Sequence, residues 1–460
     1  MTCSAAASKE KFQARESPLT TAFAQKTVVQ GLFWAWILIC VVTYAIVAVN
    51  YSYNPAQLRE DIDFVRLAFS NLSVFAVQWV ILMSVISFVA YPAAKRRLES
   101  RDAGSVAHAS QVSMAVMVIV TVPLYTIYAL KLHMVLRLAT VIEQLRLLMK
   151  MISFLVECER KRKRLQAAHK TERTEDPTTL RSLLYFLFAP TMIYRDAYPR
   201  ASKPTNWLVV CSYAVQFVAI ALFNVVIVNQ HLSPRLRVIG SRPLSRDELL
   251  ALGIRSVGFI FYLLLEIGYG FFHCWCNIFA EVMGFGDRMF YKDWLSAINI
   301  MDFMRTWNYV THAWIAEYLF KPLLRWSGSR WTSICLVMTV AGLAHDYIIN
   351  VCFGILLLFE TSWVPFLILM AVWTKMKQGK REPSVEKTRN RRKRGFTLSV
   401  FVLLLIINIC EFGSIVTEYH ATRNCPRPDH GWRSSVLAPH FFSCGSFVSF
   451  DSEAQALFPN

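Results

Sequence analysis

Long apolar runs with few charges alternate with shorter polar segments along most of this chain. An apolar run of about 20 residues is long enough to cross the ~30 Å hydrocarbon layer of a membrane as a helix. The pattern therefore predicts an all-α polytopic membrane protein. About nine transmembrane helices are expected, and their first residues are Val28, Leu67, Gln111, Ala139, Asn206, Ser256, Ser333, Ser362 and Phe396.

One of these runs leaves two interpretations open. Ala139–Val156 mixes apolar residues with Glu143, Arg146 and Lys150. It is either a crossing that turns its charges toward the helix bundle or a helix that lies at the membrane interface.

The distribution of Lys and Arg predicts the orientation of the chain. With the N-terminus in the cytosol and nine crossings, the basic segments after Tyr91, Val156 and Trp373 all face the cytosol, as the positive-inside rule requires. Four arginines between residues 235 and 246 then fall on the luminal side, against that rule. The expected organisation is a cytosolic segment at 1–27, a membrane-embedded domain at 28–418 and a luminal tail at 419–460.

Composition and charge narrow the class of protein. Of the 460 residues, 55% are hydrophobic and only 17% are charged, which excludes an ordinary soluble protein. A net charge of +18 would favour nucleic-acid binding in a soluble protein. Here it indicates basic cytoplasmic loops that attract anionic headgroups or phosphates, so no nucleic-acid partner is expected.

The eleven cysteines do not predict a metal site, because most lie inside apolar runs. The run from His273 to Cys276 reads HCWC, which lacks zinc-site spacing and a second ligand pair. Cys425 and Cys444 differ, because they lie in a polar tail that contains prolines. They are a reasonable disulfide pair if that tail faces an oxidising lumen.

Two charged or titratable residues interrupt the apolar run Ser333–Phe359 at its middle, namely His345 and Asp346. Placing such a group at the centre of a membrane span costs roughly 2.5–3.5 kcal/mol on insertion scales. One interpretation is a histidine that caps a neighbouring helix inside the bundle. The other is a general base held within the membrane, with its partners elsewhere in the chain.

A second cluster of polar and aromatic residues reads GFGDRMFYKDWLSAINIMDFMRTWNYVTHAW. Within it, Arg305, Asn308 and His312 have spacings of three and four, so on a continuous helix they share one face, with Trp307 beside it. This arrangement predicts a polar pocket next to the bilayer. The alternative is an interfacial helix whose polar face is simply solvated.

The runs FGDRMFYKDW, RTWN and AxxAHDY occur in this order, and the chain resembles the membrane-bound O-acyltransferase superfamily. More narrowly it resembles the sterol O-acyltransferase (acyl-CoA:cholesterol acyltransferase) branch, with the diacylglycerol O-acyltransferases as close cousins. PTMIYRDAYPR extends the likeness upstream. Taken together, the resemblance covers the chain from about Gln144 to the C-terminus. It implies the fold of that family.

The resemblance also implies roles for individual residues. The membrane-embedded catalytic histidine of the family corresponds to His345, and the active-site asparagine to Asn308. Trp307 and His312 match residues that line the same chamber. Phe290, Tyr291, Asp293 and Trp294 match a signature associated with acyl-CoA binding, from which Leu295 and Ser296 depart. Lys292 and Arg305 add positive charge on the side where anionic acyl-CoA arrives, and Cys425 and Cys444 match a terminal disulfide.

The expected chemistry is ester formation between an acyl-CoA and the hydroxyl of a sterol. A neutral His345 would remove the hydroxyl proton, and Asn308 would donate to the developing oxyanion. Asp346 is adjacent to His345, so on a helix it points elsewhere. No serine or cysteine nucleophile beside a base is evident, which favours direct transfer without an acyl-enzyme. No cofactor is expected besides the co-substrate acyl-CoA.

Three further expectations follow from the resemblance: the endoplasmic reticulum membrane as the location, a dimer or tetramer as the assembly, and a sterol or other lipid alcohol as the acceptor. Two alternatives to a sterol enzyme remain open from the sequence. One is a diacylglycerol or other lipid-alcohol acyltransferase. The other is a non-catalytic lipid-binding protein or a transporter, although no internal repeat is visible.

Overall fold

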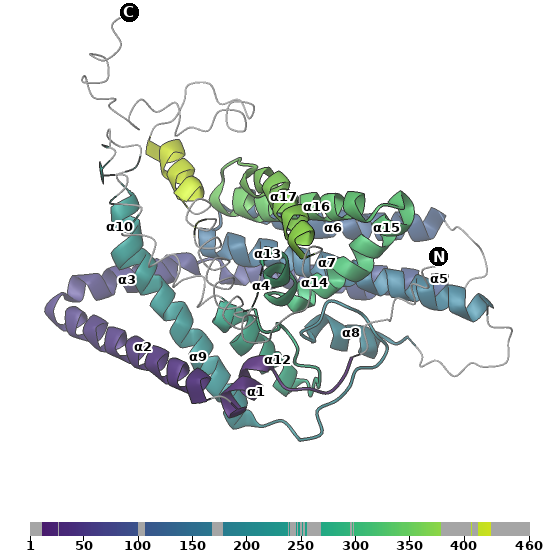
Figure 1. Ribbon diagram of the computed structural model, residues 1–460, viewed down its shortest axis with the longest axis horizontal. Helices are drawn as coiled ribbons and strands as arrows, with labels where there is room; N and C mark the ends of the chain where they lie inside the picture. Colours follow the sequence, from purple (N-terminus) through teal and green to yellow (C-terminus); the bar gives the residue numbers. More distant parts are fainter. Residues whose placement is uncertain are drawn as a thin grey trace, which may run out of the picture.

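The computed structural model describes residues 12–25, 27–99, 106–167, 178–237, 268–294 and 299–378, together with short pieces at 239, 245, 247–248, 251, 254, 297, 406 and 413–424. Within these residues every regular element is a helix, and the extended pairs are two isolated bridges. The all-α class predicted from the apolar runs is therefore confirmed. Figure 1 shows how the helices are arranged.

Four described helical segments are long and apolar enough to cross a membrane, at Pro55–Glu99, Val106–Ala129, Trp207–Gln230 and Arg330–Phe353. They overlap the spans predicted to begin at Leu67, Gln111, Asn206 and Ser333. Shorter apolar helices at Ile37–Tyr53 and Phe359–Met370 overlap two more. The first part of the run that begins at Ser256, and most of the run that begins at Phe396, lie outside the described residues. The count of nine crossings stays a prediction.

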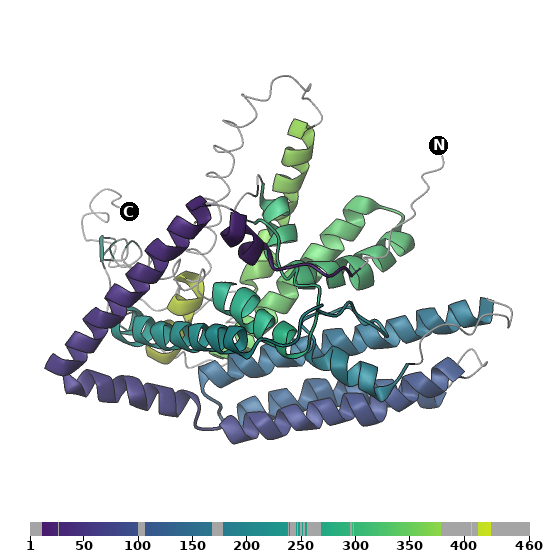
Figure 2. The ribbon, with the colours of Figure 1, turned by 90° about the horizontal axis from the view of Figure 1, so that it is seen from below.

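The longest helix, α7 (Met134–Ala167), organises the described part of the bundle. At 34 residues it is about 50 Å long. It packs against α4 (Leu72–Val85), α5 (Tyr91–Glu99) and α6 (Val106–Ala129), and Figure 2 shows these helices side by side. Leu147, Met151 and Phe154 of α7 are buried in the largest apolar core. The ambiguous run Ala139–Val156 is thus the middle of a longer, largely buried helix.

The charges within this run are paired inside the bundle. Lys150 is almost fully buried, and its Nζ donates to the carbonyl oxygens of Phe186, Leu187 and Ala189 at 2.7, 2.9 and 2.8 Å. Those carbonyls close the C-terminal end of α8 (Leu180–Phe188), where a cation is favourable. Arg146 pairs with Glu143, which also accepts from Trp79. Of the two interpretations, these contacts favour the one in which the charges face the bundle.

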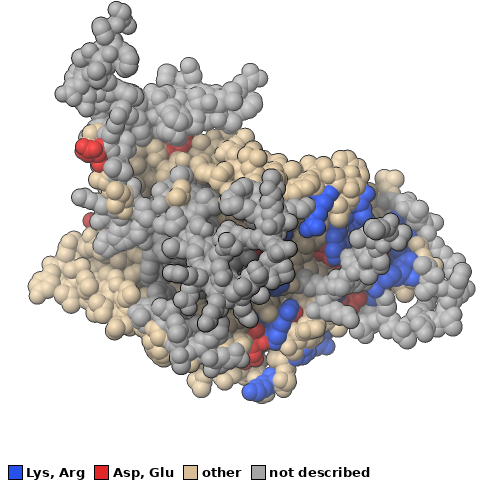
Figure 3. All heavy atoms as spheres, in the orientation of Figure 1, with Lys and Arg blue, Asp and Glu red and all other residues tan. Residues whose placement is uncertain are grey.

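Basic residues from two predicted cytosolic exits lie at the same end of the molecule. Arg97 on α5 is 3.6 Å from Glu159 on α7, so the two basic helix ends meet. Figure 3 shows Lys and Arg side chains gathered over the end where α5 and α15 (Lys321–Ser327) lie. A shared basic end agrees with the predicted cytosolic side.

An ionic network joins this end of α7 to the helices that follow the candidate site. Nη1 of Arg160 lies 2.8 Å from Glu157 and 2.6 Å from Glu317, which also pairs with Lys321. Glu317 belongs to the π-helical turn η4 (Ala316–Phe320). One turn earlier, the indole N–H of Trp314 donates to the Met149 carbonyl oxygen at 2.9 Å. The segment after Asn308 is therefore anchored on α7.

Candidate active site

Two of the motifs named from the sequence lie side by side. The backbone N–H of Lys292 donates to the Thr306 carbonyl at 2.8 Å, and that of Tyr309 donates to the Phe290 carbonyl at 3.1 Å. These two bonds tie residues 290–294 to residues 305–309. The predicted acyl-CoA signature and the RTWN segment therefore form one unit.

An aromatic cluster packs around Trp307. Its ring lies 4.8 Å from the Trp294 ring in an edge-to-face contact and 5.6 Å from the Phe303 ring in a stacked one. A Cβ placed on Gly268 would approach the Trp307 ring to 2.5 Å, so this position requires glycine. Trp307 is held by residues from three separate segments, which gives its ring a defined orientation.

The other signature residues differ in how they are held. Phe290 is 1% exposed, and the buried hydroxyl of Tyr291 lies 2.8 Å from Nδ1 of His273 and 3.0 Å from Oγ of Ser17. Burial raises the pKa of Tyr291, so its phenol stays neutral.

The Lys292 ammonium stands 3.7 Å from the centroid of the Tyr309 ring. Asp293 is exposed to solvent, while Leu295 and Ser296 lie outside the described residues.

The predicted helix through Arg305, Asn308 and His312 is broken. α13 (Ile300–Thr306) ends before Trp307, and α14 (Tyr309–Ile315) begins after Asn308, whose φ of −117° and ψ of 78° are not helical. The expectation that the three residues share a continuous helix face is therefore wrong. Arg305 is exposed at the end of α13, 3.8 Å from Asp302.

Asn308 is the N-cap of α14. Its Oδ1 accepts from the Thr311 N–H at 3.1 Å, which satisfies one of the unpaired donors of a helix start. This bond also identifies the side-chain oxygen, because only the oxygen can accept. The two N–H donors on Nδ2 have no acceptor among the described residues. The cap thus orients Asn308 and leaves donors for another group.

His312 lies one turn into α14, and its backbone N–H donates to the Asn308 carbonyl at 3.0 Å. Burial lowers the pKa of its imidazole, and the positive charges of Arg305 and Lys292 lower that pKa further. His312 is therefore a neutral group beside Asn308.

His345 lies on α16 (Arg330–Phe353), and its side chain is exposed. Nδ1 of its ring is 2.8 Å from the Ala341 carbonyl oxygen one turn earlier. A carbonyl can only accept, so Nδ1 carries the proton and Nε2 of the neutral ring has the free lone pair. The helix backbone therefore sets the tautomer that a general base needs.

Two residues on the same face of α16 as His345 are buried. Met338 and Cys352, seven residues before and after His345, lie on the same side of the helix, and both are buried. Val340 and Leu343, on the opposite side, are 46% and 47% exposed. The exposed His345 ring is therefore an accessible polar group on the more buried face of the helix.

The contacts of Asp346 differ from those of its neighbour His345. It is buried, and its carboxylate accepts from the backbone N–H groups of Glu360 and Thr361 at 2.8 and 3.0 Å and from the Thr361 hydroxyl at 2.6 Å. These donors lie at the start of α17 (Phe359–Gln378). A Cβ on Gly342 would lie 3.1 Å from the Thr361 Cα, so the two helices pack closely there. The expectation that Asp346 does not orient His345 agrees with these contacts.

Sequence reasoning missed three residues that touch the signature, namely Arg15, Ser17 and His273. His273 drew attention only through a metal pattern, and among the described residues no cluster of metal-binding side chains is present. The two N-terminal residues carry no periodic signal, and their partners lie more than 250 residues away. Cys425 and Cys444 lie outside the described residues, so their disulfide stays a prediction.

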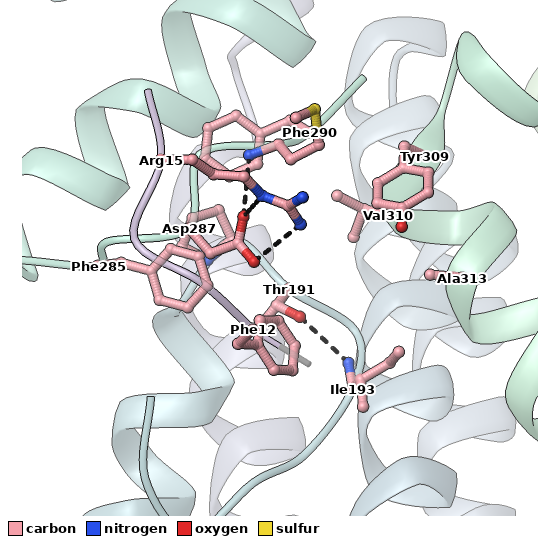
Figure 4. A pocket seen from close by; sticks show the side chains of 12 residues that line it. Phe12, Arg15, Thr191, Ile193, Phe285, Asp287, Phe290, Tyr309, Val310 and Ala313 are labelled. Carbon is pink, nitrogen blue, oxygen red and sulfur yellow. Dashed lines mark hydrogen bonds and ion pairs between the residues drawn. The ribbon is translucent and has the colours of Figure 1, made fainter. Parts of the chain in front are cut away.

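A small pocket adjoins the signature, and Figure 4 shows its lining. One side is formed by Phe285, Asp287 and Phe290, and the other by Tyr309, Val310 and Ala313. Phe12 and Arg15 from the N-terminal segment complete the wall. The pocket is mainly apolar, with an Arg–Asp pair at one edge.

Comparison with known proteins gives a consistent result. A model of the membrane-bound O-acyltransferase family matches residues 106–378, which include His345, Asn308 and the whole signature. Over 413 residues the chain is 28% identical to sterol O-acyltransferase 2 of Homo sapiens, covering 88% of this chain and 75% of that protein. Over 236 residues it is 38% identical to sterol O-acyltransferase 1 of Cricetulus griseus, covering 50% of this chain and 42% of that protein.

Proposed function

Because this chain belongs to the membrane-bound O-acyltransferase family and is a membrane-embedded, acyl-CoA-dependent O-acyltransferase, we propose that it transfers a long-chain acyl group to the hydroxyl of a sterol. The product is a sterol ester for storage. The sterol as acceptor is supported by the names of the two relatives. We further propose that the protein works in the endoplasmic reticulum membrane as a homo-oligomer.

The observation that carries the chemistry is the hydrogen bond from His345 to the Ala341 carbonyl. With Nδ1 protonated, Nε2 accepts the hydroxyl proton as the sterol oxygen attacks the thioester carbonyl. A carbon–oxygen bond forms, and the carbon–sulfur bond of acyl-CoA breaks. The imidazolium returns its proton to the departing CoA thiolate, so His345 ends the cycle neutral.

Asn308 serves the developing oxyanion in this proposal. Its oxygen is engaged with Thr311, so the group that faces substrate is the Nδ2 amine, a hydrogen-bond donor. One such donor is worth about 2.7–4 kcal/mol of transition-state stabilisation in measured cases. His312 is held neutral beside it by burial and by the nearby charges of Arg305 and Lys292, which lower its pKa.

The acyl donor approaches from the basic end. Acyl-CoA is anionic, and Lys292 and Arg305 place two positive charges at the signature. Phe290, Trp294 and Trp307 provide apolar and aromatic surface for the acyl chain. The sterol enters from the bilayer, toward the more buried face of α16.

The test uses microsomes from cells that express the chain, supplied with labelled oleoyl-CoA and either cholesterol, diacylglycerol or a long-chain alcohol. We expect labelled sterol ester with cholesterol, and its loss in His345→Ala at matched expression. Triacylglycerol or wax ester as the main product would overturn the sterol acceptor. No ester with any acceptor, from protein that elutes as a single folded species, would overturn the proposed reaction.

A further inference from the structure

The N-terminal segment Phe12–Ser17, here called the strap, pairs with residues 285–288. These residues lead into the signature and are here called the signature loop. The Arg15 N–H donates to the Gly286 carbonyl at 2.9 Å, and the Arg288 N–H donates to the Arg15 carbonyl at 3.0 Å. On its other side, Gly286 donates to the Pro199 carbonyl at 2.9 Å. The loop is therefore held between two extended segments, and a Cβ on Gly286 would meet the Pro199 oxygen at 2.9 Å.

An ion pair reinforces this backbone pairing. The Arg15 guanidinium contacts both carboxylate oxygens of Asp287, with Nε to Oδ1 at 2.5 Å and Nη2 to Oδ2 at 3.0 Å. The Asp287 side chain is 5% exposed and also accepts from the Gln13 N–H at 3.2 Å. A bidentate pair fixes both distance and orientation. Without Arg15, a buried negative charge would remain beside the site proposed for an anionic substrate.

The two ends of the strap are anchored by different contacts. Phe12 packs edge-on against the rings of Tyr198 and Phe285, with centroids 5.3 and 6.3 Å apart. Ser17 is fully buried, and its hydroxyl lies 3.0 Å from the hydroxyl of Tyr291 in the signature. Along its length, the strap therefore touches the loop before the signature and the signature itself.

Figure 4 shows that the strap forms part of the pocket wall. Arg15 reaches to Asp287, and Phe12 lies beside Phe285. Both strap residues line the pocket together with Phe290 and Tyr309. The strap lies outside residues 106–378, which the family model matches. Its contribution is therefore an addition from outside the matched domain.

We propose that the strap is a positioning element for acyl-CoA, in which the Arg15–Asp287 pair holds the signature loop in its binding conformation and cancels the Asp287 charge. Arg15 and Asp287 are positioning residues, because they act through the loop. The proposal rests on the proposed function in one respect, namely that the signature binds acyl-CoA. Release of the strap weakens acyl-CoA binding and leaves the chemical step at His345 unchanged.

Charge reversal and charge exchange test the pair in the full-length chain. In Arg15→Asp, the KM for oleoyl-CoA should rise about tenfold or more, because one partner of a buried charge pair is removed. The kcat for ester should change less than about twofold, and the KM for cholesterol should stay at the parental value. The exchange variant Arg15→Asp/Asp287→Arg should recover a KM within about threefold of the parent, because it restores the pair.

The chain offers a matched control for these variants. Arg66 pairs with Asp63 at 3.3 Å, and both side chains are highly exposed. Arg66→Asp makes the same charge change in an exposed pair, where little free energy is at stake, so it should leave the oleoyl-CoA KM unchanged. If Arg15→Asp fails to accumulate in membranes, the milder Arg15→Gln should still raise that KM.

Hydrogen exchange provides a readout that does not depend on turnover. In purified parent protein, peptides that contain residues 12–17 and 285–290 should be protected, and Arg15→Asp should remove the protection in both. An unprotected strap in the parent overturns the proposal. A KM for oleoyl-CoA that stays at the parental value in a variant whose strap is released also overturns the proposal. A parent that makes no ester refutes the proposed function, while the exchange data still decide whether the strap is docked.

Discussion

The two parts of the chain that are proposed to form the site are built in different ways. On the loop side, residues 285–312, the backbone and side chains are held by distant segments, including the strap and Gly268. On the helix side, His345 is oriented by its own helix, four residues back, and Asp346 accepts from Glu360 and Thr361 at the start of the next helix. The comparison teaches that the proposed binding residues depend on many remote contacts, whereas the proposed catalytic base depends on local ones. Apart from Asn308, mutations on the loop side should change KM, and mutations on the helix side should change kcat.

The largest effect is expected at His345. Removing a general base costs about 10²–10⁴-fold in rate, so His345→Ala should lower the kcat for ester by at least about 100-fold. His345→Gln keeps a polar side chain but cannot take a proton, and it should be equally impaired. Oleoyl-CoA binding should remain parental in both, as measured by equilibrium binding of labelled oleoyl-CoA. An active His345→Gln enzyme would show that proton transfer is not the function of this residue.

Asn308 should give the next largest effect, and it has two roles to separate, because it caps a helix and is proposed to face substrate. Asn308→Asp keeps the oxygen that accepts from Thr311 but loses the N–H donors, whereas Asn308→Ala loses both. If the donor stabilises an oxyanion, both variants should lose about 10²-fold or more in kcat. Only Asn308→Ala should also lower the thermal unfolding midpoint.

The opposite pattern at Asn308 would reassign the residue. Near-parental turnover in Asn308→Asp would mean that capping of α14 is its whole contribution. The same assay at matched expression, with unfolding followed in detergent, separates the two roles.

Asp346 tests whether the helix side is stabilised locally. Asp346→Leu leaves the N–H groups of Glu360 and Thr361 without their acceptor, and each unpaired buried donor costs about 1–3 kcal/mol. We expect a lower unfolding midpoint and a roughly tenfold lower kcat, with the oleoyl-CoA KM unchanged. Asp346→Asn keeps one accepting oxygen and should lie between Asp346→Leu and the parent. A rise in KM with unchanged stability would contradict the division between the two sides.

The difference between the sides also explains what the sequence could predict. Apolar runs set the positions of α4, α6, α9 (Trp207–Val226) and α16, because long helices in lipid follow hydrophobicity alone. Helical spacing was sufficient to separate the direction of Asp346 from that of His345. Both inferences depend on residues within a few turns of each other.

The loop side was less predictable, since its geometry depends on tertiary contacts. The break between α13 and α14 carries no Gly or Pro, and the amphipathic pattern continues through it. The one sequence signal for this break was Asn308 itself, because asparagine is among the preferred residues at the N-cap of a helix. The strap lies about 270 residues from its partner loop in a polar, non-periodic segment, so no local rule connects them.

The smallest predicted effect concerns pH and belongs to the loop side alone. The pKa of His312 is lowered in the folded protein, chiefly by burial and then by Arg305 and Lys292, so the folded state disfavours the charged ring. The unfolded chain binds the proton near the usual value of about 6.5. Stability from this group is therefore complete above that pH and is lost as pH falls below it toward the folded pKa.

A comparison of His312→Phe with the parent isolates this group, because every other histidine is present in both proteins. The variant should gain stability relative to the parent as pH falls from 7.5 to 5.5, measured as the difference between their thermal unfolding midpoints in detergent. A difference that does not change over this range would mean that His312 is as accessible to protons as a free imidazole. His312 lies near Asn308 and the positive charges of Arg305 and Lys292. That result would therefore also remove the reason to regard this part of the loop side as shielded from water.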